Sequence, residues 1–153
     1  MMDKTTELLS VAATKLQANY VTVSIPDLSP EALPMSLRIG IFATQSGDLR
    51  WVSIPGAGTF CARVMRESSP LTVSCLSESE QQEACTLLQD TGPFAYLGVP
   101  IPAVTGGSIG TLAAQYKGER VWSQANADDA EHTARQIGFE MLPLAMRDGR
   151  NLV

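Results

Sequence analysis

The segment covering residues 94–114 (FAYLGVPIPAVTGGSIGTLAA) constrains the fold most, because it reads as two apolar strands joined by a tight turn. Residues 94–101 form the first run, and residues 109–114 run back. The glycines in the turn at residues 105–108 reach the positive φ values that such reversals need. Because both runs are apolar nearly throughout, we expect them to lie in the middle of a sheet that is covered on both faces.

Apolar periodicity predicts the remaining elements. We expect helices over residues 1–18, 60–67, 78–88 and 124–145, and further strands over residues 19–25, 37–43, 49–54 and 70–74. In the first strand, Tyr20 should face away from Val21 and Val23. The last helix has an inward stripe of Ala127, Ala130, Ala134, Ile137 and Met141, and Pro143 should fray its end. Short turns between consecutive strands predict an antiparallel sheet in an α+β (α/β/α) domain, with the first and last helices packed on one face.

Composition sets the class of protein. At 153 residues the chain is expected to form one domain over residues 1–153, and 44% hydrophobic with 18% charged residues indicates a globular one. The net charge of -5 and the lack of a Lys/Arg cluster argue against nucleic-acid binding. No apolar run is long enough for a membrane span, and no signal peptide is visible, so we expect a cytoplasmic protein whose three cysteines are free thiols.

Four segments occur in an order that resembles GAF domains, the small-molecule-sensing modules of signalling proteins. They are PGAGTFCARVMRESSPLTV (55–73), AYLGVPI (95–101), GSIGTLAA (107–114) and RVWSQANADD (120–129). The resemblance covers roughly residues 5–146 and implies a GAF/PAS-like sheet of five to six strands. It also implies a ligand pocket on the sheet face opposite the terminal helices, roofed by residues 60–90. One departure is that Ser74 and Cys75 stand where many relatives have Asp.

The resemblance and the aromatic side chains together suggest a binding site for a small flat or anionic ligand. The side chains expected to line it are Trp51, Phe60, Cys61, Val64, Cys75, Cys85, Phe94 and Tyr96. Alternation places Phe94 and Tyr96 on the same face of their strand. The alternative is that the aromatic residues simply fill the core. Neither the identity of the ligand nor any cofactor is specified by the sequence.

The cysteines raise a second hypothesis, because free methionine-(R)-sulfoxide reductases are enzymes with a GAF scaffold and a similar layout. Their G-x-x-C matches Gly58 to Cys61, and Cys85 could match their reactive cysteine. Such chemistry needs a thiolate, a resolving thiol and an acid. Trp51 stands in place of their third cysteine, and residues 109–115 contain no Asp or Glu. Cys85 and Cys61 could therefore be a redox pair, a catalytic pair or two buried apolar groups.

Other cofactor sites have weaker support. Cys75 could hold a tetrapyrrole as in some phytochrome-like relatives, but neither Cys75 nor Cys85 precedes the histidine that those proteins carry. The single histidine, His132, should face solvent or a subunit contact, and no Cys/His spacing predicts a metal site. The N-K-x-x-x-F-D-E signature of cyclic-nucleotide-binding relatives is absent. We therefore expect a non-enzymatic sensory domain that signals through its terminal helices to a partner protein or to the second subunit of a homodimer.

Overall fold

The computed structural model describes residues 3–32, 35–56, 59–76, 94–103 and 106–151. For residue 76 and residues 141–151 the description covers the backbone only. The helix expected over residues 78–88 and the thiol of Cys85 thus lie outside the described residues. The same applies to the side chain of Met141 in the expected helix stripe.

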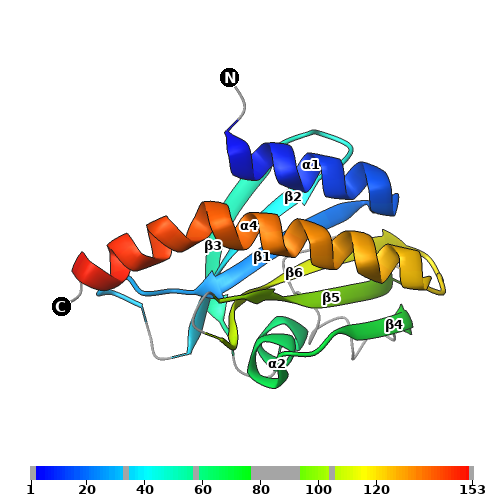
Figure 1. The fold of residues 1–153 in the computed structure, drawn as a ribbon. Helices are drawn as coiled ribbons and strands as arrows, with labels where there is room; N and C mark the ends of the chain where they lie inside the picture. Colours follow the sequence, from blue (N-terminus) through cyan, green and yellow to red (C-terminus); the bar gives the residue numbers. More distant parts are fainter. Residues whose placement is uncertain (1–2, 33–34, 57–58, 77–93, 104–105, 152–153) are drawn as a thin grey trace.

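The described strands form one antiparallel sheet, as predicted. They are β1 (Tyr20–Pro26), β2 (Ser36–Ala43), β3 (Leu49–Pro55), β4 (Leu71–Leu76), β5 (Phe94–Pro102) and β6 (Ser108–Lys117). Their order across the sheet is β3-β2-β1-β6-β5-β4, and every neighbouring pair is antiparallel (Figure 1). β1 and β6 are therefore the two central strands.

The β5–β6 hairpin confirms the prediction made for residues 94–114. Its turn contains Gly106 and Gly107 at φ values of 99° and 71°, which only glycine adopts without strain. The amide of Ala103 donates a 3.0 Å hydrogen bond to the carbonyl of Gly107 and closes the turn. In β5, residues 94–99 are all buried, because helices cover both faces of this part of the sheet.

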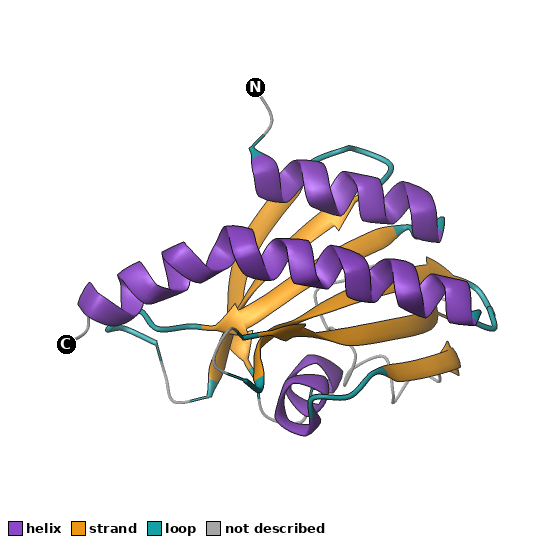
Figure 2. Cartoon of the chain, in the orientation of Figure 1, coloured by secondary structure: helices purple, strands orange, loops and turns teal. Residues whose placement is uncertain are grey.

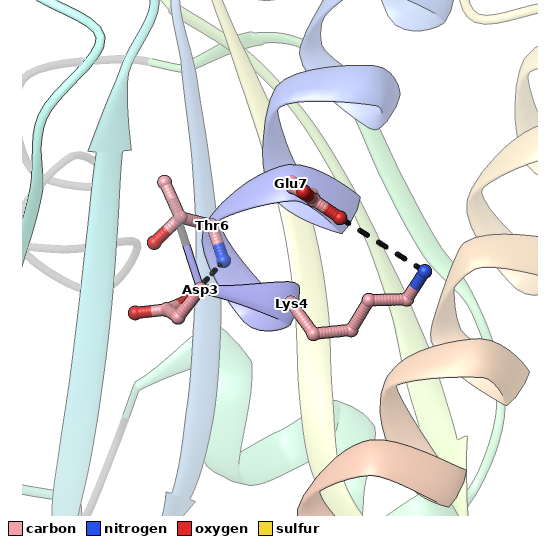
Figure 3. Close-up of polar contacts among 4 residues, drawn as sticks. All are labelled: Asp3, Lys4, Thr6 and Glu7. Atoms are coloured by element: carbon pink, nitrogen blue, oxygen red, sulfur yellow. Dashed lines mark hydrogen bonds and ion pairs between the residues drawn. The ribbon is translucent and has the colours of Figure 1, made fainter. Parts of the chain in front are cut away.

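Helices α1 (Lys4–Leu16) and α4 (Gln124–Asn151) lie side by side on one face of the sheet (Figure 2). α1 begins later than expected because the Asp3 carboxylate caps it, accepting a 2.7 Å hydrogen bond from the amide of Thr6 (Figure 3). A 4.0 Å ion pair between Lys4 and Glu7 spans the same turn. α1 ends where Gln17 adopts left-handed φ and ψ angles.

α4 extends to Asn151, six residues beyond the expected end at Ala145. The helix continues through Pro143, although that residue cannot donate the hydrogen bond to the carbonyl of residue 139, so the fraying expected there is not observed. None of the helices in the described part of the chain is long and apolar enough to cross a bilayer.

The terminal helices and the sheet enclose the main core. Its buried members come from α1, β1, β2, β5, β6 and α4, and include Leu9, Leu16, Val21, Val23, Phe42, Leu97, Val99, Leu112, Ala134 and Ile137. Tyr20 packs instead with clusters on the opposite face, as the alternation of its strand predicted.

The third layer is α2 (Phe60–Glu67), which lies on the face opposite the terminal helices (Figures 1 and 2). Its N-cap is Thr59, whose hydroxyl accepts a 3.1 Å hydrogen bond from the amide of Ala62 and donates one of 2.8 Å to the carbonyl of Gly56. α2 buries Phe60, Cys61 and Val64 toward the sheet. The domain therefore has the predicted order of layers, with α2 as the described part of the roof.

Candidate functional site

Five of the eight predicted ligand-binding residues meet between α2 and the sheet. Phe60 and Tyr96 form an edge-to-face pair with ring centroids 5.2 Å apart, and Phe94 lies in the same cluster. Cys61 and Val64 are buried on the inner side of α2. The aromatic cluster and α2 thus place Phe60, Cys61, Val64, Phe94 and Tyr96 in one layer.

The other three residues do not join this group. Trp51 packs against the core beneath the terminal helices, where its ring lies over Gly40 and the Arg38 guanidinium stacks 5.1 Å from it. Register explains this position, because Trp51 pairs with Gly40 and both point away from α2. Cys75 is exposed on the edge strand β4, and Cys85 lies outside the described residues.

Tyr96 lies flat against the sheet and reaches the inner side of α2. Its ring passes over Gly98, where an added Cβ would lie only 2.6 Å from the tyrosine hydroxyl. The hydroxyl forms a 3.6 Å contact of hydrogen-bond geometry with the Cys61 thiol. The glycine of the AYLGVPI segment therefore makes room for the aromatic residue two positions before it.

Four buried polar side chains lie on this same face along the junction of β1 and β6. They are Thr22 and Ser24 from β1 and Thr111 and Gln115 from β6, and each is at most 1% exposed. We call these four residues the polar seam. None of the four was predicted as a site residue, although the sequence carries two signals for them. Thr22 and Ser24 alternate with apolar residues in β1, and Gln115 ends an otherwise apolar run in β6.

The polar seam is incompletely hydrogen-bonded. Thr111 Oγ1 donates a 2.7 Å hydrogen bond to the carbonyl of Cys61, which ties α2 to β6. Gln115 Nε2 donates to Thr22 Oγ1 over a long 3.4 Å. Ser24 Oγ and Gln115 Oε1 are buried and have no hydrogen-bond partner. An unpartnered buried polar atom costs about 1–3 kcal/mol, so two of them in one layer call for a functional explanation.

The Cys61 thiol lies beside the polar seam. Burial raises its pKa, and the nearby hydroxyls of Ser24 and Tyr96 offset this only in part. The Ser24 hydroxyl is close enough to influence the thiol, but its geometry falls short of a hydrogen bond. A raised pKa keeps Cys61 protonated near neutral pH, and the thiol is a poor nucleophile. Cys61 is therefore not activated, while Cys85, which the redox hypothesis makes the reactive thiol, lies outside the described residues.

The described part of the chain has few other side chains that could catalyse a reaction or hold a metal ion. Its buried polar side chains are hydroxyls and one amide, without a carboxylate. The same residues contain no group of three His, Cys, Asp or Glu side chains that could hold a metal ion. His132 is exposed on α4.

A small surface pocket of about 180 Å³ lies at the end of the central strands, beside the polar seam. Its lining residues are Asn19, Tyr20, Ala43, Gln45, Ser46 and Lys117. Tyr20 connects the two features, because it pairs directly with Gln115 across the β1–β6 junction.

Solved structures of low sequence identity share this arrangement. A GAF domain from an Acinetobacter phosphoenolpyruvate-protein phosphotransferase is 13% identical, with a TM-score of 0.69 over 95% of this chain and 86% of that one. A methyl-accepting chemotaxis protein fragment is 14% identical, with a TM-score of 0.66 over 94% and 92% of the two chains. The GAF domain of a Bacillus halodurans two-component sensor histidine kinase is 12% identical, with a TM-score of 0.62 over 92% and 95%.

At these identities the structures establish the fold alone. A comparison with curated proteins finds no significant match. A family model does match, and it is that of the GAF domain, over residues 5–141. With this match over most of its length, and with the sheet order and layers described above, the chain belongs to the GAF domain family.

Proposed function

We propose that this GAF domain is a sensory domain without catalytic activity of its own. It binds a small molecule between α2 and the sheet and transmits occupancy through α1 and α4. The observation that carries the proposal is the polar seam, in which Ser24 Oγ and Gln115 Oε1 are buried without partners. A bound molecule would supply those partners and recover the free energy that their burial costs.

The relatives support a sensory role. Similar structures come from a chemotaxis protein and from a sensor histidine kinase. Among the described residues, the raised pKa of Cys61 and the lack of buried carboxylates give thiol catalysis no support.

A chain of contacts through Arg120 offers a route for the output. Its backbone amide donates a 2.9 Å hydrogen bond to the carbonyl of Ser74 in β4. Its side chain caps the C-terminus of α1 by donating to the carbonyls of Leu16 and Gln17. The guanidinium also stacks 4.2 Å from the ring of Trp122, just before α4 begins. A shift of β4 on ligand binding would therefore reach both terminal helices.

The outer surface of the terminal helices is where we place the receiving partner. Phe139 on α4 is 79% exposed and Val11 on α1 is 48% exposed. Exposed apolar side chains of this size favour association, and a second copy of the chain or a signalling protein would bury them.

Native mass spectrometry of freshly purified protein tests ligand binding. We expect a retained small molecule in the wild type. It should be lost in Ala113→Leu, which fills the space beside Phe60 and Tyr96, and retained in the exposed control Ala125→Leu. If no molecule is retained and a metabolite library does not raise the melting temperature of the wild type, the proposal is wrong.

A further inference from the structure

We propose that Gln115 determines the ligand class of this domain, and that the ligand is a small uncharged molecule carrying an amide-like N–H and C=O pair. The inference rests on the proposed function, since it assumes that a small molecule occupies the layer between α2 and the sheet. It adds the chemistry by which that molecule is recognised.

Gln115 lies near the end of the central strand β6 and has aromatic neighbours on both sides. It pairs with Tyr20 on β1 and with Tyr96 on β5, and its own side chain is 0% exposed. The ring of Phe94 lies 6.4 Å from that of Tyr20. A glutamine is rarely buried so completely without full hydrogen bonding, so this position demands a partner for its amide.

The donors and acceptors that the Gln115 amide leaves unused define the chemistry of its missing partner. The amide has two N–H donors and one carbonyl oxygen with two lone pairs. One donor is used in the long contact with Thr22 Oγ1, which leaves one N–H and the whole of Oε1 available. Rotating the amide by half a turn would still leave one of its polar atoms without a partner. The group that complements an adjacent acceptor and donor is another amide, a lactam or a urea.

The described residues favour an uncharged ligand. Their buried polar side chains are hydroxyls and this one amide, so none of them supplies a buried charge to neutralise an ionic ligand. Lys117 lies two residues further along β6, but it is exposed at the strand end. A carboxylate or an amidinium placed against Gln115 would lose its hydration without a compensating ion pair. A neutral ligand avoids this cost.

The aromatic residues favour a ligand with a flat apolar body. Phe60, Phe94 and Tyr96 form one cluster with Ala113, and Tyr20 packs against it. Rings in offset or edge-to-face contact with such side chains gain about 0.5–1.5 kcal/mol beyond the burial of their area. Benzamide combines a flat ring with a primary amide and is therefore a suitable probe.

Three molecules of nearly the same shape test whether the ligand must be neutral and whether it must carry an amide. Benzamide is neutral, benzoate is anionic and benzamidine is cationic at neutral pH. In nuclear magnetic resonance titrations, we expect benzamide to shift the side-chain amide signals of Gln115 in a saturable way. Benzoate and benzamidine should bind about tenfold more weakly or not at all, because each lacks part of the donor–acceptor pair and carries a charge.

Substitutions test whether Gln115 is the residue that binds benzamide. Gln115→Met preserves the length of the side chain and should abolish benzamide binding, whereas the exposed control Gln136→Met should not change it. Thr22→Val removes the contact that orients the amide and should weaken binding several-fold.

The proposal fails if benzamide gives no saturable shift, if benzoate or benzamidine binds as well, or if a Gln115→Met protein that folds still binds benzamide. This outcome is separable from failure of the proposed function. A retained natural molecule that lacks an amide would overturn the ligand class and leave ligand sensing intact. If Gln115→Met does not fold, the effect of Thr22→Val on the benzamide titration decides the same question.

Discussion

Arg120 Nη1 donates a 2.5 Å hydrogen bond to the carbonyl oxygen of Leu16, the last residue of α1. The two residues are 104 positions apart, and their contact ties the C-terminus of the first helix to the segment that precedes the last. The helix C-terminus carries partial negative charge and unpaired carbonyls, so a cation at this position is favourable.

We expect Arg120→Met to lower the free energy of unfolding by about 1–3 kcal/mol, because it removes charge-assisted hydrogen bonds to two carbonyls. Arg120→Lys should restore only part of this, since a lysine ammonium does not reproduce the planar stacking on Trp122. Urea denaturation measures the loss, and hydrogen exchange should show weaker protection in the last turn of α1. The exposed Arg135→Met on α4 is the control, and an equal loss there would contradict the assignment.

Gly98→Ala should destabilise the domain by about 1–3 kcal/mol, because the new methyl would overlap the Tyr96 ring. The loss should be smaller in a Tyr96→Leu background, where no ring crosses that position. A double-mutant cycle by thermal or chemical denaturation measures the coupling between the two sites. Additive effects of the two substitutions would show that Tyr96 does not lie over Gly98.

Cys61 should react slowly with thiol reagents. In a protein carrying Cys75→Ser and Cys85→Ser it is the only thiol, and its burial and raised pKa both oppose alkylation. We expect iodoacetamide to modify it only when denaturant unfolds the domain, whereas Cys75 in the matching Cys61→Ser, Cys85→Ser protein should react at the rate of an exposed thiol.

The single variant Cys85→Ser tests the redox hypothesis. If it changes neither methionine sulfoxide turnover nor the response of the wild type to oxidant, the redox hypothesis is wrong. Rapid alkylation of folded Cys61 would instead contradict the buried, protonated thiol.

Asp27 should contribute to stability in a pH-dependent way. The Ser53 hydroxyl is the main cause of its lowered pKa, with further hydrogen bonds from Ser29. Because the folded pKa lies below the unfolded one, this contribution is present above the unfolded pKa and is lost as the pH falls through the folded one. The stability difference between wild type and Asp27→Asn should therefore shrink from about pH 6 to about pH 3. Urea midpoints measure it, with Asp48→Asn as the exposed control. A difference that does not depend on pH would contradict the hydrogen-bonding role.

Phe139 provides a test of self-association. If α4 contributes to a homodimer, Phe139→Ser should weaken it, since burying an aromatic ring is worth about 1.5–3 kcal/mol. Light scattering across a concentration series should show dimer in the wild type and in the exposed control Gln136→Ser, but a shift toward monomer in Phe139→Ser. A wild type that stays monomeric at every concentration would contradict the homodimer.

Much of the fold could be predicted because local patterns determine it. The apolar runs of the β5–β6 hairpin, the helical spacing of Leu9 and Leu16, and the glycine turn act over short distances in the sequence. The helix was predicted to end at Ala145, because a proline at position 143 usually ends a helix. No local pattern in the sequence indicates that α4 continues past this proline to Asn151.

The candidate site was harder to predict because it depends on which strands become neighbours. Trp51 was placed in the pocket on the strength of its size, but its register with Gly40 directs it to the other face. The polar seam was overlooked because Ser24 and Gln115 look like ordinary surface residues until β1 and β6 pair. That pairing joins residues about ninety positions apart, and no local pattern in the sequence signals it.

The order of the strands divides the sheet into two halves, β3-β2-β1 from the N-terminal part of the chain and β6-β5-β4 from the C-terminal part. Within each half, neighbouring strands follow one another in the sequence, so only the β1–β6 junction requires distant segments to meet, and loop closure should make it the slowest pairing during folding. Thr22 and Ser24 belong to one half, and Thr111 and Gln115 to the other. A molecule that formed hydrogen bonds with all four residues would link the two halves of the sheet. Its binding should therefore slow the separation of the halves when the protein unfolds.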